Sequence, residues 1–228
     1  MNVLTAKLPS KGYGCMTDLI SVKPLTYLEL TDYASVSPEG ELACFIHDFE
    51  VFIMTIPNWK ELSSFDCNAL IAMRKMLSID LKGSFSLSDG KEFTLQDVDF
   101  TDIEKLPLSL KEVSLNGVTY QPSIKSMDKF YHTLKLFEKE TSEIKFPVIA
   151  SYVGIEDPKV IFEFTTSDIA ICERLYRYLL SQPKISKESA KGGVEAVLFG
   201  KASDLFQSVV TLCKIDPSDL RFSEDVQV

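Results

Sequence analysis

The stretch from Leu42 to Ile53 constrains the fold more than any other part of this sequence. Its apolar side chains recur at helical spacing and predict an amphipathic helix that begins at Ser37–Glu39 and ends near Pro57. The aromatic side chains share a face that is offset from the aliphatic face, so the helix is apolar on more than one side. Such a helix either lies at the centre of the core or is covered by another chain, and both alternatives stay open here. The apolar positions are Leu42, Phe45, Ile46, Phe49, Phe52 and Ile53.

A strand pair and a short helix are predicted before this stretch. Val3–Leu8 and Leu19–Lys23 read as strands, and the turn-prone segment Pro9–Gly14 separates them. Thr26 can cap a helix, and Glu29 three residues later completes a capping box. The chain is therefore expected to open with strand, turn, strand and helix.

Two β-hairpins are predicted after the first helical block. Ser88–Lys91 is a turn in which Gly90 can take a positive φ, and Asn116-Gly117 is the strongest short hairpin signal. Each turn is flanked by runs that read as strands. The predicted strand pairs are Gly83–Leu87 with Glu92–Val98, and Leu110–Leu115 with Val118–Gln121.

These elements predict an α+β fold, with a helical core, an N-terminal strand pair and a small β-hairpin unit inserted between helical segments. Residues 1–80 hold the strands and a helical block, and residues 81–124 form the hairpin unit. Residues 125–181 complete the helical core, and residues 182–228 supply a linker, a C-terminal helix and an acidic tail. The other predicted elements are helices at Cys67–Leu77 (capped by Asp66), Ser126–Glu140, Phe146–Val153, Ile169–Leu180 (capped by Ser167 or Asp168) and Glu195–Leu212, a strand at Val160–Phe164 and a loop at 181–193.

Composition argues against two classes of partner. The chain has 228 residues and a net charge of −9, and such a charge opposes binding to the phosphates of nucleic acid. The opening Met1–Lys7 lacks the features of a signal peptide, and no apolar run approaches the ~18 residues of a membrane span. We therefore expect no nucleic-acid or membrane partner and synthesis in the cytoplasm.

The scarce histidines and cysteines offer one catalytic hypothesis. On a helix, Cys44 and His47 share a face, and Cys67 could approach from the next helix. These three residues are therefore candidates for the site of a Cys/His-dependent hydrolase or for a metal site. A metal needs three or four converging ligands, and nothing else is arranged to supply them. The favoured alternative is a partly exposed histidine with two core thiols. No phosphate-binding, serine-hydrolase or zinc-protease motif occurs, so neither an enzyme nor a cofactor is expected.

The opening block supports a family resemblance. Leu8-Pro9-Ser10-Lys11-Gly12, followed by Val22, Pro24-Leu25-Thr26 and Glu29, resembles the T4-type bacteriophage baseplate hub family. These are hub subunits or hub assembly factors in the tails of contractile-tailed phages. The resemblance covers about residues 1–150. Its weaker matches are Leu77–Asp80 at the end of a helical block, the hairpin region Phe85–Asp99, and Gly117 with Tyr120 and Pro122 before a helix near Asp128.

Two departures from the family pattern limit what the resemblance implies. Many members carry a cysteine pair in the hairpin unit, apparently for a metal, whereas Gly83–Ser86 contains no cysteine here. The family also often has an aromatic-Pro step after the turn, where this chain has Tyr13–Cys15. The resemblance therefore implies neither a metal site nor catalytic residues.

The resulting expectation is a structural or assembly protein of a phage tail baseplate hub. It would act through contacts with other tail proteins in the virion, with self-association left open, after assembly in the host cytoplasm. The alternatives are a non-virion chaperone for hub assembly and the Cys/His-dependent hydrolase. Three regions are predicted to contact partners: the opening turn, the aromatic helix and the first hairpin tip. The candidate contact residues are Pro9, Lys11, Gly12, Tyr13, Phe45, Phe49, Phe52, Trp59, Asp89 and Lys91.

Overall fold

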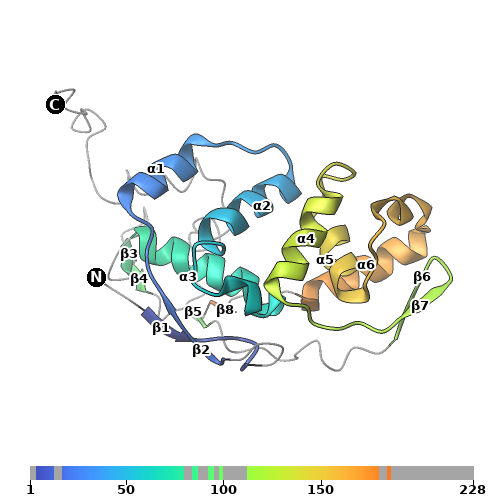
Figure 1. Ribbon diagram of the computed structural model, residues 1–228, viewed down its shortest axis with the longest axis horizontal. Coiled ribbons are helices and arrows are strands. Elements are labelled where there is room, and N and C mark those ends of the chain that lie inside the picture. Colours follow the sequence, from blue (N-terminus) through green and yellow to red (C-terminus); the bar gives the residue numbers. More distant parts are fainter. Residues whose placement is uncertain are drawn as a thin grey trace.

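Helices and short strand pairs alternate along the chain in the computed structural model, which confirms the predicted α+β fold (Figure 1). The structure describes residues 4–12, 17–79, 84–86, 92–94, 98–99, 112–179 and 184–185. Within these ranges lie six α-helices and four two-stranded antiparallel sheets. None of the helices in the described ranges is long and apolar enough to cross a membrane.

The chain opens with the predicted strand pair and capped helix. Strand β1 (Leu4–Lys7) pairs antiparallel with β2 (Leu19–Val22), and the following helix is α1 (Tyr27–Ser35). The Thr26 hydroxyl accepts a bond from the Glu29 main-chain N–H at 3.3 Å, and the Glu29 carboxylate accepts one from the Thr26 N–H at 2.7 Å. The capping box is therefore confirmed.

Helix α2 (Glu41–Phe52) is shorter than the sequence predicts at both ends. Gly40 precedes it at φ 91° and ψ 156°, a left-handed value that ordinary side chains avoid. The Leu42 N–H, in the first turn of α2, donates to the Ser142 carbonyl at 2.8 Å. The predicted start at Ser37–Glu39 is wrong because the non-helical backbone at Gly40 interrupts the chain before the helix.

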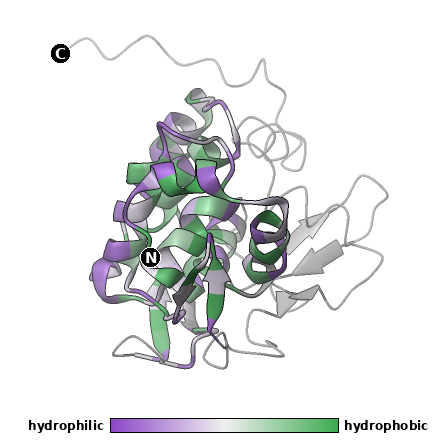
Figure 2. Cartoon of the chain, turned by 90° about the vertical axis from the view of Figure 1, so that its right-hand side faces the viewer, coloured by the Kyte–Doolittle hydropathy of each residue, from purple (hydrophilic) through white to green (hydrophobic). Residues whose placement is uncertain are grey.

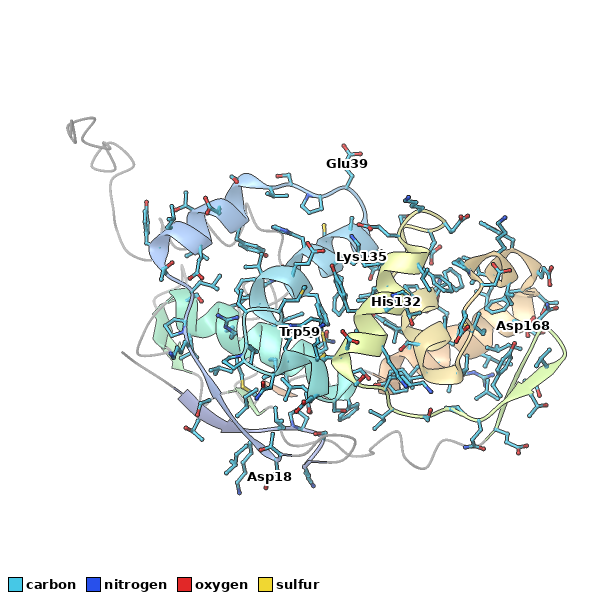
Figure 3. All side chains as sticks on the ribbon, in the orientation of Figure 1. Asp18, Glu39, Trp59, His132, Lys135 and Asp168 are labelled. Atoms are coloured by element: carbon cyan, nitrogen blue, oxygen red, sulfur yellow. The ribbon has the colours of Figure 1, made fainter. Side chains whose placement is uncertain are left out.

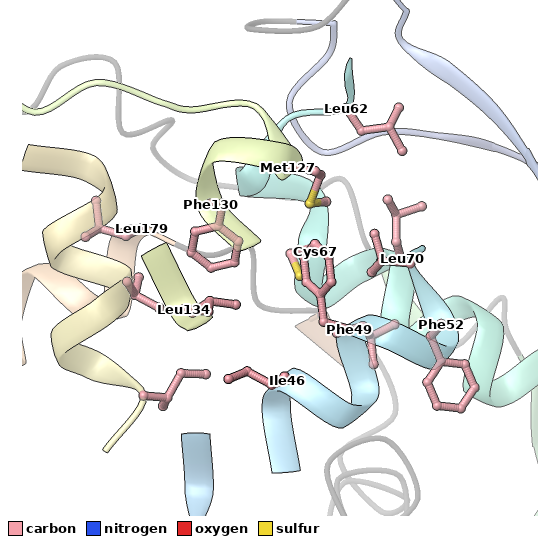
Figure 4. Close-up of a cluster of buried hydrophobic side chains, with 14 of the residues drawn as sticks. Ile46, Phe49, Phe52, Leu62, Cys67, Leu70, Met127, Phe130, Leu134 and Leu179 are labelled. Carbon is pink, nitrogen blue, oxygen red and sulfur yellow. The ribbon is translucent and has the colours of Figure 1, made fainter. Parts of the chain in front are cut away.

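Helix α2 lies at the centre of the core between α3 (Cys67–Ile79) and α4 (Met127–Phe137) (Figures 1 and 4). Phe49 stacks on Tyr131 at 5.1 Å between ring centroids and meets the edge of Trp59 at 5.6 Å. Each such side chain contributes about 1.5–3 kcal/mol when it is removed from water. The first alternative for this helix, a place in the chain's own core, is confirmed. Its fully enclosed positions are Leu42, Ile46, Phe49 and Phe52.

The second helical block follows the predictions at two of its helices and departs from them at two elements. Helices α4 and α5 (Lys145–Val153) lie where they were predicted. The predicted strand at Val160–Phe164 is wrong, because Asp157 accepts a bond from the Lys159 N–H and starts the 3-10 helix η5 (Pro158–Glu163). Helix α6 (Thr166–Leu179) begins three residues before the predicted Ile169. Figure 2 shows hydrophobic and hydrophilic residues along the same helices, as packing of amphipathic faces requires.

The strands of the predicted hairpin unit do not join one sheet. The hairpin of β3 (Ser84–Ser86) and β4 (Glu92–Thr94) is confirmed, and the second pairs β6 (Val113–Leu115) with β7 (Val118–Tyr120). Its turn residues Asn116 and Gly117 have φ of 50° and 72°, as a type I′ turn requires.

A third strand pair corrects two predictions. Strand β5 (Val98–Asp99) pairs with β8 (Lys184–Ile185), so Val98 pairs with a different strand from Glu92–Thr94. The predicted loop at 181–193 contains β8. The predicted helix at Glu195–Leu212 and the acidic tail lie outside the described residues. The remaining short elements are η1 (Trp59–Glu61) and η2 (Ser64–Asp66).

Candidate functional site

A buried polar cluster, the Asp48 network, joins α1, α2 and α3. The Lys75 ammonium donates to Asp48 Oδ2 at 2.7 Å, and the Tyr33 hydroxyl donates to Asp48 Oδ1 at 2.6 Å. The Lys75 side chain has no exposed surface, and the Asp48 side chain keeps 20% of its surface exposed. Breaking such a pair leaves an uncompensated buried charge, so the network favours one arrangement of the three helices.

Aromatic rings complete the surroundings of the Lys75 charge. Its Nζ lies 5.9 Å from the centroid of the Tyr33 ring and 5.6 Å from that of Phe52. These distances fall in the range of cation–π attraction. Burial and the neighbouring Asp48 raise the pKa of the Tyr33 hydroxyl, so Tyr33 stays protonated and donates its hydrogen bond. The network is thus a stable donor–acceptor set around one carboxylate.

The predicted cysteine–histidine pair makes other contacts. His47 Nε2 lies 3.2 Å from the Tyr33 carbonyl oxygen, and the His47 ring stacks on the Tyr33 ring at 5.0 Å. The Cys44 thiol donates to the Pro38 carbonyl at 3.4 Å. Cys67 is fully buried, and this burial raises its pKa well above the ordinary value and disfavours a thiolate. No group of three or more histidine, cysteine or acidic residues in the described ranges could hold a metal ion.

The opening turn docks onto a buried carboxylate at the start of α3. Asp66 accepts one bond from the Ser10 N–H and one from the Ser10 hydroxyl, both at 2.7 Å. Burial raises the pKa of the Asp66 carboxyl to about 6, and the two bonds from Ser10 oppose this rise. Lys11 and Gly12 take left-handed φ values of 53° and 81° as the chain turns away. The Ser10–Asp66 bonds therefore hold the turn against the start of α3, and the Lys11 side chain is exposed to solvent.

A buried arginine, Arg74 of α3, joins the end of α2 to the segment between β2 and α1. The Arg74 guanidinium donates to the Phe52 carbonyl at 2.8 Å and to the Lys23 carbonyl at 2.9 Å, and it also bonds to the Thr55 hydroxyl. A cation at a helix C-terminus satisfies carbonyls that the helix leaves without partners. This contact and the Asp48 network together hold the C-terminal half of α2 against α3.

The second hairpin is fastened at the opposite end of the structure in Figure 1. The Asn116 N–H donates to the Asp168 carboxylate at 3.1 Å, and the Asn116 side-chain amide donates to Glu163 at 2.7 Å. Asp168 also accepts bonds from the N–H and hydroxyl of Thr165, and these bonds hold the pKa of Asp168 below its usual value. Since the Asp168 N–H donates back to Thr165, the true cap of α6 is Thr165.

Several predicted contact residues have no surface for a partner. Phe49 and Phe52 are fully buried, Trp59 is 9% exposed and Pro9 is buried, so the structure corrects the prediction for these four. Phe45 is half-buried and its ring lies edge-on to Phe130 at 6.3 Å. Aromatic residues of α4 cover Phe45, Phe49 and Trp59, and Tyr33 of α1 meets the Phe52 ring at 4.9 Å. Lys11 is exposed and Gly12 half-buried, whereas Tyr13, Asp89 and Lys91 lie outside the described residues.

A different exposed surface, on α1, was not predicted from the sequence. Tyr27 and Leu28 on α1 are 57% and 69% exposed, and Val36 behind the helix is 45% exposed. The available signal was charge, because residues 24–59 contain no lysine or arginine. Beyond Val36, at Glu39 and Ala43, a hollow of about 310 Å³ opens between the start of α2 and the end of α4.

Comparisons with known proteins found no matching family model, no matching curated protein and no matching solved structure.

Proposed function

We propose that this chain is a structural or assembly protein of a phage tail baseplate hub and that it acts through protein–protein contacts. The proposal starts from the resemblance of the opening block to the T4-type baseplate hub family. One structural observation supports it: the residues that carry the resemblance form a single folded unit. A likeness in residues that fold together is a better basis for the proposal than one in scattered surface positions.

Each part of the opening block has a role in that unit. Leu8 and Val22 are 1% exposed and place the strand pair on the core. Ser10 bonds to Asp66, while Thr26 and Glu29 cap α1. The block therefore builds the junction between the strand pair and the helices, and it leaves Lys11 as the exposed group at its tip.

The opening turn is the contact region that the proposal retains from the sequence. Its backbone is held by the Ser10–Asp66 bonds and by a 3.0 Å bond from the Lys11 N–H to the Leu8 carbonyl. A side chain on a fixed turn loses little conformational freedom when a partner binds. Lys11 is thus placed to pair with an acidic group on a neighbouring tail protein.

The test is copurification with the other tail proteins of the same phage. Wild type should elute with at least one of them, and Lys11→Glu should weaken the complex. Lys159→Glu, which reverses an exposed lysine at the other end of the structure, is the matched control and should not weaken it. A chain that stays monomeric with every tail protein, and whose deletion still yields infectious particles, would contradict the proposal.

Mass spectrometry of purified particles separates the two roles within this class. A hub subunit remains in the virion. An assembly factor is absent from particles, although its deletion abolishes tails.

A further inference from the structure

The outer side of α1 is an exposed apolar surface. The helix turns Leu30 and Tyr33 into the core, where they are 5% and 2% exposed. Its other side leaves Tyr27 and Leu28 more than half exposed. In Figure 1, α1 and its connection to α2 run along one edge of the molecule. We call the segment Tyr27–Glu39, whose outer side is exposed, the ridge.

The ridge carries negative charge, since its own residues include three acids and no lysine or arginine. Asp32 and Glu39 are exposed, and the bonds from Thr26 hold the pKa of Glu29 below its usual value, so Glu29 stays ionised. The cations Arg74 and Lys75 are buried and bonded to main-chain carbonyls and to Asp48. Residues 24–59 hold six acids and no lysine or arginine: Glu29, Asp32, Glu39, Glu41, Asp48 and Glu50.

The hollow of about 310 Å³ continues the ridge at its C-terminal end. Glu39 lines it from the ridge, and Glu138, Lys139 and Glu140 line it from the end of α4. Glu138 pairs with Lys135 at 2.6 Å, and the three acids of the lining outnumber its one lysine. Its wall is built by the contact of the two elements, since Leu42 donates to the Ser142 carbonyl at 2.8 Å. Figure 3 shows Glu39 projecting outward at this edge. The C-terminal end of α4 adds the negative end of its helix dipole, so the hollow suits a cationic side chain.

We propose that the ridge and its hollow bind a basic amphipathic helix of a neighbouring tail protein. Apolar side chains of that helix cover Tyr27 and Leu28, and its lysines or arginines pair with Asp32 and Glu39. Charge complementarity selects this occupant: a second copy of the chain, with its net charge of −9, would bring acids against acids. The inference rests on the proposed function only in naming a tail protein as the source of the helix.

The experiment uses the purified full-length chain and a labelled amphipathic peptide of about 18 residues, with leucines on one face and lysines on the other. We expect binding that weakens as salt rises from 50 to 300 mM, and no binding of the same peptide with glutamates in place of lysines. The double variant Leu28→Ser, Asp32→Lys should weaken binding about tenfold. The matched control Phe162→Ser, Glu156→Lys alters one exposed apolar and one exposed acidic residue near η5 and should stay within about twofold.

A second measurement needs no variant. Hydrogen exchange of the wild-type chain with the lysine peptide should show protection confined to residues 27–39 and the end of α4. The proposal is overturned if wild type does not bind, if both double variants lose affinity equally, or if protection falls elsewhere. Because these measurements use only the purified chain and a peptide, their failure is separate from failure of the copurification that tests the proposed function.

Discussion

Asp66 and Asp168 each lie at the start of a helix, but the pKa values of their carboxyl groups shift in opposite directions. Each lies at the N-terminal end of a helix and holds a β-turn that is more than fifty residues away, Ser10 at 56 and Asn116 at 52. Their side chains are nearly closed to solvent, with 0% and 7% of the residue surface exposed. Asp66 lies among the buried residues of η2 and α3, whereas Asp168 lies at the edge of the structure (Figure 3).

Because burial affects Asp66 more strongly than Asp168, the pKa values of the two carboxyl groups shift in opposite directions. At Asp66, burial outweighs the two bonds from Ser10 and raises the carboxyl pKa to about 6. At Asp168, the bonds from Thr165 outweigh burial and lower the pKa. Folding therefore disfavours the ionised carboxylate at Asp66 and favours it at Asp168, which gives opposite contributions to stability at neutral pH.

The largest expected effect is the pH dependence that Asp66 imposes. Its pKa is 3.8 in the unfolded chain and about 6 in the folded one, so the folded state binds more protons between these values. Stability should fall as pH rises from 4 to 7, by about 3 kcal/mol from this group. Asp66→Asn should flatten the profile, measured by urea unfolding with the fluorescence of the single tryptophan, Trp59. A profile in Asp66→Asn as steep as in wild type would contradict this assignment.

Asp168 should act with the opposite sign. Its lowered pKa means that the folded state releases protons more readily than the unfolded chain does. Its contribution is present above the unfolded pKa and is lost as pH falls through the folded pKa. Asp168→Asn should therefore reduce the loss of stability below pH 4 in the same urea experiment, whereas Asp66→Asn should not.

Removing one donor from Asp66 is the next largest test. Ser10→Ala deletes the hydroxyl bond to the buried carboxylate and should cost about 2 kcal/mol at pH 7, since bonds to charged groups are the stronger ones. It should also raise the Asp66 pKa further, which moves the pH profile upward. Ser21→Ala on the same strand pair is the control: its hydroxyl bonds to Thr5 in solvent, so the change should stay within about 0.5 kcal/mol.

The sequence predicted Asp66 as a helix cap and Asp168 as one of two alternatives, with Ser167, for the cap of a later helix. The outcome shows which contacts local sequence patterns can predict. The capping box of Thr26 and Glu29 and the turn of Asn116-Gly117 were predictable because their partners lie within three residues. Asp168 does belong to a helix start, but as the partner of Thr165. Asp66 instead receives Ser10, and no local rule identifies a partner 56 residues away.

The same limit explains the aromatic helix. Its periodicity predicted α2 and its buried positions, but whether α4 or another chain covered the aromatic face depended on tertiary packing. The ridge was missed for a different reason. The exposure of Tyr27 and Leu28 cannot be read from apolar positions in a short helix, and the absence of lysine and arginine from residues 24–59 was the one signal available.

At the Asp168 junction, the turn itself should contribute more than its side-chain bonds. Asn116→Ala forces a side chain with a poor left-handed propensity into φ 50° and should cost about 1–2 kcal/mol. Asn116→Gly keeps the turn conformation and loses the amide bond to Glu163, so it should cost less than Asn116→Ala. Equal losses in the two variants would mean that the amide bond, rather than the backbone, stabilises the junction.

The smallest effect is expected at Glu163, and it sharpens the contrast with Asp66. Glu163 is exposed and accepts the Asn116 amide at 2.7 Å, a bond that competes with water on both sides. Glu163→Gln keeps a carbonyl acceptor and should change stability by less than about 0.5 kcal/mol at pH 7, in urea unfolding followed by Trp59 fluorescence. A loss as large as that of Ser10→Ala would contradict this prediction. It would mean that the exposed Glu163–Asn116 bond stabilises the fold as much as the buried Asp66–Ser10 bond does.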